Sequence, residues 1–154
     1  MLHFLKARFL LAECAMASGD GKRSAEILTA EAGRIVSREA RANLAARIRA
    51  LADECFQPKA VLPGPAGGKR APDYARAAVL YREAASYLSP DSVDPDLSPR
   101  IAESFLLLGA YADAEAEATA AIAAFGPKSA TADPAALAKS RYILGRSLLK
   151  SGQK

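Results

Sequence analysis

The sequence predicts an all-α fold in which antiparallel helical hairpins stack into a short array of about seven helices. Hydrophobic residues make up 51% of the 154 residues but aromatic residues only 6%, and most of the apolar content is Ala and Leu, which favour helices. Apolar positions recur at spacings of three and four, and no run of β-branched residues alternates with polar ones. The length is sufficient for one core, so residues 1–154 are expected to form a single domain.

Three helices are expected before residue 57. Residues 2–18 carry one apolar stripe through Leu11 and Cys14 and another through Phe9 and Met16, a pattern typical of a helix that packs on two sides. The second helix is expected at about 23–36 and the third at about 38–56. Their inward residues are predicted to be Ala25, Leu28, Ala32 and Ile35, and then Ala40, Leu44, Ile48, Leu51 and Cys55. The arginines around the third helix, which are Arg34, Arg38, Arg41, Arg47 and Arg49, are expected to extend into water.

Residues 57–73 interrupt the helical pattern. This segment contains four prolines and three glycines, together with the basic pair Lys69-Arg70. Proline removes a backbone donor and glycine adds conformational entropy, so the segment predicts a loop insertion and the least ordered internal part of the chain. It is either a binding loop or an insertion that the fold tolerates.

Four helices are expected after this loop. The fourth, at about 73–88, begins at Asp73 as its N-cap, and Pro99 is expected in the first turn of the fifth. The fifth and sixth helices form a hairpin whose tight turn contains Gly109, and Asp133 with Pro134 starts the seventh. The inward residues of the fourth helix are Tyr74, Ala77, Ala78, Tyr81, Ala84, Ala85 and Leu88, and those of the sixth are Tyr111, Ala114, Ala118, Ala121, Ile122 and Phe125.

The hairpin at 98–127 resembles the tetratricopeptide repeat. The signature of that family is Leu-Gly, an aromatic residue, Gly, Ala-x3-aromatic and Pro. The matching positions are Ile101-Ala102, Phe105, Gly109, Ala114 and Gly126-Pro127, although Ser98 replaces the tryptophan and Ala118 the late aromatic. In such repeats each unit buries its apolar face only against its neighbours, so the resemblance implies a helical scaffold.

The seventh helix resembles the first helix of such a repeat. Leu144-Gly145, Leu148 and Gly152 follow the signature, with Arg141 in the place of its tryptophan. A first helix without its second leaves an apolar face uncovered. We therefore expect the sequence to be a piece of a longer array, and we expect self-association through this C-terminal helix.

No active site, metal or cofactor is expected, and we interpret the chain as non-enzymatic. The one histidine, His3, lies near the N-terminus, and the glycines before Lys69 lack the spacing of a phosphate-binding loop. Cys14 and Cys55 lie on apolar stripes, where free cysteines behave as small hydrophobes, although a bridge between them stays possible. The longest apolar stretch, residues 105–112, is too short to span a bilayer.

The function implied by the resemblance is that of a protein–protein interaction scaffold. A peptide segment of a partner would lie in the concave face lined by the odd-numbered helices. The candidate groove residues are Arg8, Glu13, Arg41, Glu103, Tyr142, Arg146 and Lys150. The inner helices offer no Asn near Glu13, Glu103, Tyr142 and Arg146, so the chain departs from the carboxylate clamp that some members use to hold a peptide C-terminus.

Two other functions compete with this interpretation. The chain could be an oligomerisation module that contacts partners through its terminal helical faces. Residues 1–72 carry 12 Lys or Arg against 7 Asp or Glu, and this excess could favour nucleic acid, but acidic residues interleave and no aromatic residues accompany the arginines. A cytoplasmic location is favoured, because Glu13 interrupts the apolar segment that a signal peptide would need.

Overall fold

The structure is a computed structural model that describes residues 2–32, 38–58, 71–88, 94–127, 129 and 131–152, without the side chains of 2–6, 31 and 32. Within these ranges the chain forms seven α-helices and no strand, which confirms the predicted all-α class and the number of helices. The helices are α1 (Leu2–Ala17), α2 (Gly21–Ala32), α3 (Arg38–Phe56), α4 (Tyr74–Ser86), α5 (Leu97–Leu108), α6 (Tyr111–Phe125) and α7 (Pro134–Ser151).

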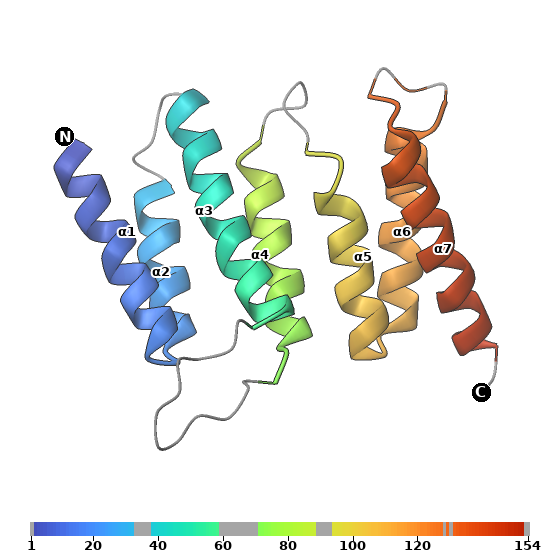
Figure 1. Cartoon of the computed structure of the whole chain (residues 1–154), viewed down its shortest axis with the longest axis horizontal. Helices are drawn as coiled ribbons and strands as arrows, with labels where there is room; N and C mark the ends of the chain where they lie inside the picture. Colours follow the sequence, from blue (N-terminus) through green and yellow to red (C-terminus); the bar gives the residue numbers. More distant parts are fainter. Residues whose placement is uncertain are drawn as a thin grey trace.

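The helices follow one another side by side in chain order (Figure 1). Side-chain ion pairs join helices that are separated by one helix in the chain, and these pairs define two layers. Glu13 of α1 pairs with Arg47 of α3, and Glu103 of α5 pairs with Lys139 of α7. On the other side, Arg82 of α4 pairs with Glu117 of α6. Helices α1, α3, α5 and α7 therefore form one layer, and α2, α4 and α6 form the second.

Turn glycines and predicted capping residues define the hairpins. Gly19 and Gly109 have φ values of 88° and 82°, a left-handed conformation that glycine adopts without steric cost. The Asp73 and Asp133 carboxylates accept hydrogen bonds from the backbone N–H groups of Arg76 and Ala136, which confirms both predicted N-caps. Pro134 occupies the first turn of α7, as expected.

The main core extends from α1 to α5, and smaller clusters lie around α6 and α7. Leu44, Ile48 and Tyr81 are fully buried in the main cluster. In the second half, Ala102 and Ala118 are both fully buried and belong to one cluster with Ile143. Two alanines facing each other let α5 and α6 approach closely, so the packing there depends on small side chains.

Two predicted inward patterns are wrong. In α1, Phe9 and Met16 are buried but Leu11 is 46% exposed and Cys14 is exposed, because α2 and α3 cover only one of the two apolar stripes. Cys14 and Cys55 form no disulfide in the structure, and Cys55 is half-buried. In α2, Ser24 and Leu28 are buried, whereas Ala25 is exposed. Leu28 fixes the buried side of α2, and position 24, one turn earlier, faces the core instead of position 25.

Some predictions fall outside the described residues. Most of the 57–73 loop insertion lies in 59–70, and the predicted end of the second helix lies in 33–36. Ile35, which was predicted to point inward, lies outside the described residues, and so does the side chain of Ala32, which was also predicted inward.

Candidate functional site: a charged face across four helices

The layer of α1, α3, α5 and α7 repeats one short sequence pattern. In each helix a small residue is followed directly by a charged one. The four pairs are Ala12-Glu13, Ala52-Asp53, Ala102-Glu103 and Gly145-Arg146. The three alanines are at most 1% exposed, so each charged neighbour lies at the edge of the packed interface. Because the small residue occupies the same place in each helix, the charged residue after it also does, and the four charges lie along the layer.

The first contact across the face joins α1 to α3. Arg47 donates from Nη1 to Glu13 Oε1 at 3.0 Å, and its guanidinium lies 4.7 Å from the centre of the Phe9 ring. The Arg47 and Glu13 side chains are 42% and 47% exposed. An ion pair this exposed stabilises the fold by at most about 1 kcal/mol. Glu13, predicted for the groove, therefore lies on the face with a cation beside it.

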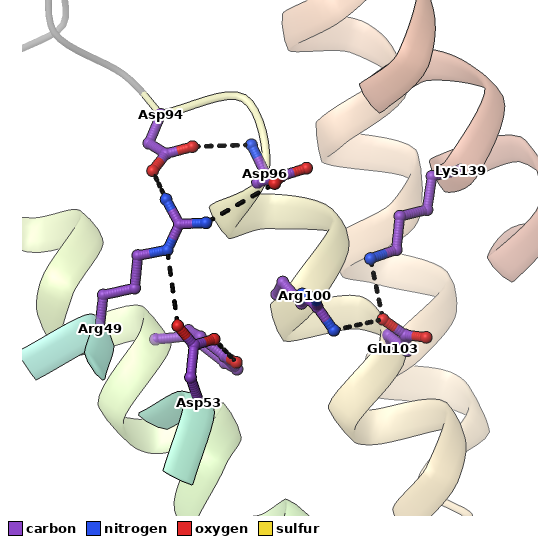
Figure 2. A network of polar contacts seen from close by, with 8 residues as sticks. Arg49, Asp53, Asp94, Asp96, Arg100, Glu103 and Lys139 are labelled. Atoms are coloured by element: carbon purple, nitrogen blue, oxygen red, sulfur yellow. Dashed lines mark hydrogen bonds and ion pairs between the residues drawn. The ribbon is translucent and has the colours of Figure 1, made fainter. Parts of the chain in front are cut away.

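Arg49 makes the second connection, from α3 to the turn before α5 (Figure 2). Its guanidinium pairs with Asp94 and lies 3.6 Å from Asp96 Oδ2, and its Nε lies 4.0 Å from Asp53 Oδ2. The Arg49 side chain is only 31% exposed. The expectation that Arg49 extends into water is therefore wrong. Three carboxylates surround its planar guanidinium, and the fork of donors can serve more than one of them at once.

Two tyrosine hydroxyls make further polar contacts, one with Asp53 on the face and one at the C-terminal end of α4 in the other layer. The Tyr81 hydroxyl donates to Asp53 Oδ1 at 2.5 Å. Burial raises the pKa of Tyr81 above its usual value, and the hydrogen bond to Asp53 raises it further, because both favour the neutral phenol. Tyr87 donates to Glu83 Oε1 at 2.7 Å, and burial together with this bond raises its pKa to about 12.

The third connection joins α5 to α7 through Glu103, another predicted groove residue. Lys139 Nζ lies 2.9 Å from Glu103 Oε2, and Arg100 Nη1 lies 3.5 Å from the same oxygen (Figure 2). The Arg100 guanidinium also lies 5.0 Å from the centre of the Phe56 ring on α3. Arg100 thus contacts α3 and Glu103 at once, and the face is continuous from α3 to α7.

A hollow of about 580 Å³ opens beside Glu103, between the end of α3 and the last turn of α5. Phe56 and Tyr74 pack edge to face there, with ring centres 5.4 Å apart. Leu107, on the rim, is 49% exposed. The lining residues are Phe56, Gln57, Pro58, Ala71, Pro72, Tyr74, Glu103 and Leu107. The hollow is mainly apolar and has one carboxylate at its edge.

The other predicted groove residues are less closely associated with this hollow. Tyr142 and Arg146 are exposed on α7, where the guanidinium lies 5.9 Å from the ring centre, and Lys150 is exposed in the last turn. Arg8 is half-buried on α1. Arg41 is exposed near the start of α3, about 22 Å along the helix from Phe56.

Sequence reasoning missed Arg49, Asp53 and Lys139. Asp53 could have been found, because it follows Ala52 as Glu13 follows Ala12. The partners of Arg49 come from the turn before α5, about 45 residues later in the chain, so no local pattern indicates them.

Comparison of the chain with protein-family models, with curated proteins and with solved structures found no match. None of the described helices combines the length and the apolar character needed to cross a membrane.

Proposed function

We propose that the chain is a protein-interaction scaffold that binds a peptide segment of another protein along the face of α1, α3, α5 and α7. The hollow beside Glu103 is the observation that carries this proposal. Phe56, Tyr74 and Leu107 offer apolar surface to one inserted side chain. Burying a Leu- or Phe-sized side chain is worth about 1.5–3 kcal/mol, enough to anchor a short peptide.

The charges along the face of α1, α3, α5 and α7 provide a direction for the peptide. Glu13, Asp53 and Glu103 place carboxylates on α1, α3 and α5, whereas Arg146 and Lys150 are basic residues on α7. Complementary charges favour one orientation over the reverse. The peptide chemistry that fits best is an apolar anchor with acidic residues on the side that lies over α7.

We also propose that the array belongs with tetratricopeptide-like scaffolds and acts by holding a partner rather than by chemistry. The support is the repeated register of small residues, together with the left-handed glycines Gly19 and Gly109, each seven residues after a buried alanine. In both cases this glycine ends the first helix of a hairpin. A recurring unit of this kind is typical of repeat architectures.

The test is to select peptides from a random library with the complete chain and to measure their affinities by fluorescence anisotropy. Leu107→Asp should weaken the selected peptides about tenfold or more, because it places a charge on the rim of the apolar hollow. Val79→Asp is the matched control, since Val79 is 62% exposed on α4 in the other layer.

Both variants change exposed residues, and circular dichroism should show that both stay folded. The proposal predicts that peptides bind the Val79→Asp variant like the unchanged chain. If Leu107→Asp has no effect, or if both variants lose binding equally, the hollow is not the peptide site.

A further inference from the structure

Helix α7 carries an exposed row of side chains, here named the α7 outer stripe. It consists of Arg141, Tyr142, Gly145, Leu148 and Leu149. Tyr142 is 62% exposed, Leu148 49% and Leu149 58%. The buried side of the same helix is made of Ala136, Ser140, Ile143 and Ser147, which face α5 and α6. Tyr142, Leu148 and Leu149 thus point away from the helices that α7 contacts, whereas Ile143 packs against them.

The corresponding positions in α5 are covered. The pattern Leu144-Gly145 of α7 corresponds to Ile101-Ala102 of α5, which sets the register between the two helices. In that register the α7 outer stripe matches Ser98, Pro99, Ala102, Phe105 and Leu106, and every one of these is buried or half-buried. Ala118 of α6 packs with Ala102 at the centre. In α5, therefore, two adjoining helices cover what α7 leaves open, since Arg82 of α4 lies over Phe105 and Ala118 of α6 packs with Ala102.

The difference in coverage between α5 and α7 is also seen at Gly145. A Cβ built on Gly145 meets nothing within 4 Å, whereas its counterparts Ala12, Ala52 and Ala102 are at most 1% exposed. The glycine leaves room for a second helix backbone to come close. The glycines after the two helices also differ in conformation. Gly109, after α5, has φ 82°, whereas Gly152, after α7, has φ −74°.

The charge of α7 specifies the chemistry of the helix that would fit. Helix α7 contains no Asp or Glu, and Arg141, Arg146 and Lys150 are all exposed. Helix α6, which packs on Ala102 at the centre of the equivalent surface of α5, contains Asp113, Glu115 and Glu117 and no basic residue. It is also rich in alanine. An acidic helix with small residues on its packing side complements α7 in both charge and shape.

We propose that the α7 outer stripe binds an acidic, alanine-rich amphipathic helix of another protein, which places a small residue against Gly145. No residue of α7 lines the hollow beside Glu103, and the proposal does not depend on peptide binding there. The basic residues on either side of Gly145 select acidic helices, and the small contact residue selects helices that can approach closely.

The probe is a blocked synthetic peptide with the sequence of α6, residues 111–125, added to the complete isotope-labelled chain. The amide resonances of Ala138 and Leu149 on α7 should shift during the titration, because both flank Gly145 one or two turns away. A peptide with Asp113, Glu115 and Glu117 changed to Gln should bind about two- to fivefold more weakly for each charge that contacts α7.

Gly145→Leu should weaken peptide binding about tenfold or more, since its side chain fills the space into which the helix must come. Ala30→Leu on α2 adds the same side chain to an exposed position in the other layer and should leave binding unchanged. Equal affinity of the peptide for Gly145→Leu and for the unchanged chain would overturn the proposal. If the chain alone dimerises and Gly145→Leu makes it monomeric, a second copy is the occupant and the proposal is wrong.

Discussion

Helices α5 and α7 start from nearly the same sequence pattern and reach different environments. Each carries a Leu- or Ile-small residue pair and a glycine seven residues after the small residue. In α5 the small residue is fully buried against α6, and the glycine turns the chain back into the next helix. In α7 the small residue, Gly145, faces open space, and Leu148 and Leu149 beside it are about half exposed.

This difference shows that the burial of a repeat helix depends on its neighbours as much as on its own residues. Both helices are well formed, with regular ends at Leu108 and Ser151. Only α5 has packed helices on both sides, since it contacts α4, α6 and α7. In stacked arrays the stability of each unit includes the interface with the next one. Helix α7 therefore lacks one of the two interfaces that stabilise α5.

The largest contrast is expected when the same bulk is added at the two matched positions. Ala102→Leu should lower the free energy of unfolding by about 1–3 kcal/mol, because its side chain would clash with Ala118 across a close helix contact. Gly145→Leu should raise it by about 0.5–1 kcal/mol, because glycine is a poor helix former and the site has room. Urea unfolding of both variants measures the two effects. Destabilisation by Gly145→Leu would mean that α7 is already covered.

The turn glycines provide the next contrast. Gly109→Ala should cost about 1–2 kcal/mol, since an L-residue at φ 82° places its Cβ too close to the backbone. Gly152→Ala should change stability by only a few tenths of a kcal/mol, because φ is −74° there and the residue is exposed at the end of α7. Thermal unfolding compares the pair. If both variants lose the same stability, the left-handed conformation of Gly109 does not require glycine, and the two positions do not differ as described.

The sequence predicted the helices and the turns of this comparison well, because both depend on local chemistry. The period of the apolar residues and the caps Asp73 and Asp133 placed most helix boundaries within a few residues. The exposed face of α7 was also expected from its pattern. What the sequence did not predict was which stripe of α1 would be covered, because that choice depends on where α2 and α3 pack.

The candidate site was only partly predictable for the same reason. Glu13 and Glu103 were named in advance as groove residues, because the resemblance placed them on the groove side of the inner helices. Arg49 was assigned to solvent, since its partners Asp94 and Asp96 lie in a distant turn. The hollow beside Glu103 joins residues from three helices and from both ends of the segment between α3 and α4. Such a site arises from tertiary packing and leaves no periodic signal.

The packed part of the array should also respond to alkaline pH through Tyr81. Tyr81→Phe should cost about 1 kcal/mol at neutral pH, because the hydroxyl loses its bond to Asp53. Since the pKa of Tyr81 is raised in the folded chain, its contribution is complete below about pH 10 and decreases as the pH rises further. The stability difference between the two proteins should therefore shrink above about pH 10. A constant difference up to pH 12 would contradict the assigned role of this burial.

The smallest effect is expected at the ion pair that joins α7 to α5. Lys139→Met removes the cation 2.9 Å from Glu103 but keeps the aliphatic stem. The pair is about one-third exposed, and Arg100 stays beside the carboxylate, so the loss should be below about 1 kcal/mol. Urea unfolding at low and high salt measures it. A larger loss would mean that this ion pair, rather than apolar packing, holds α7 on the array.

Native-state hydrogen exchange tests most directly whether α5 and α7 differ as described. Amides in the middle of α5, around Ala102, should exchange only through global unfolding, because helices pack on both of its sides. Amides in the middle of α7, around Gly145, should exchange through local openings of lower free energy, and the α6 peptide should slow them. If α7 is protected as strongly as α5 in the chain alone, its outer stripe is already covered, and the distinction between the two helices is wrong.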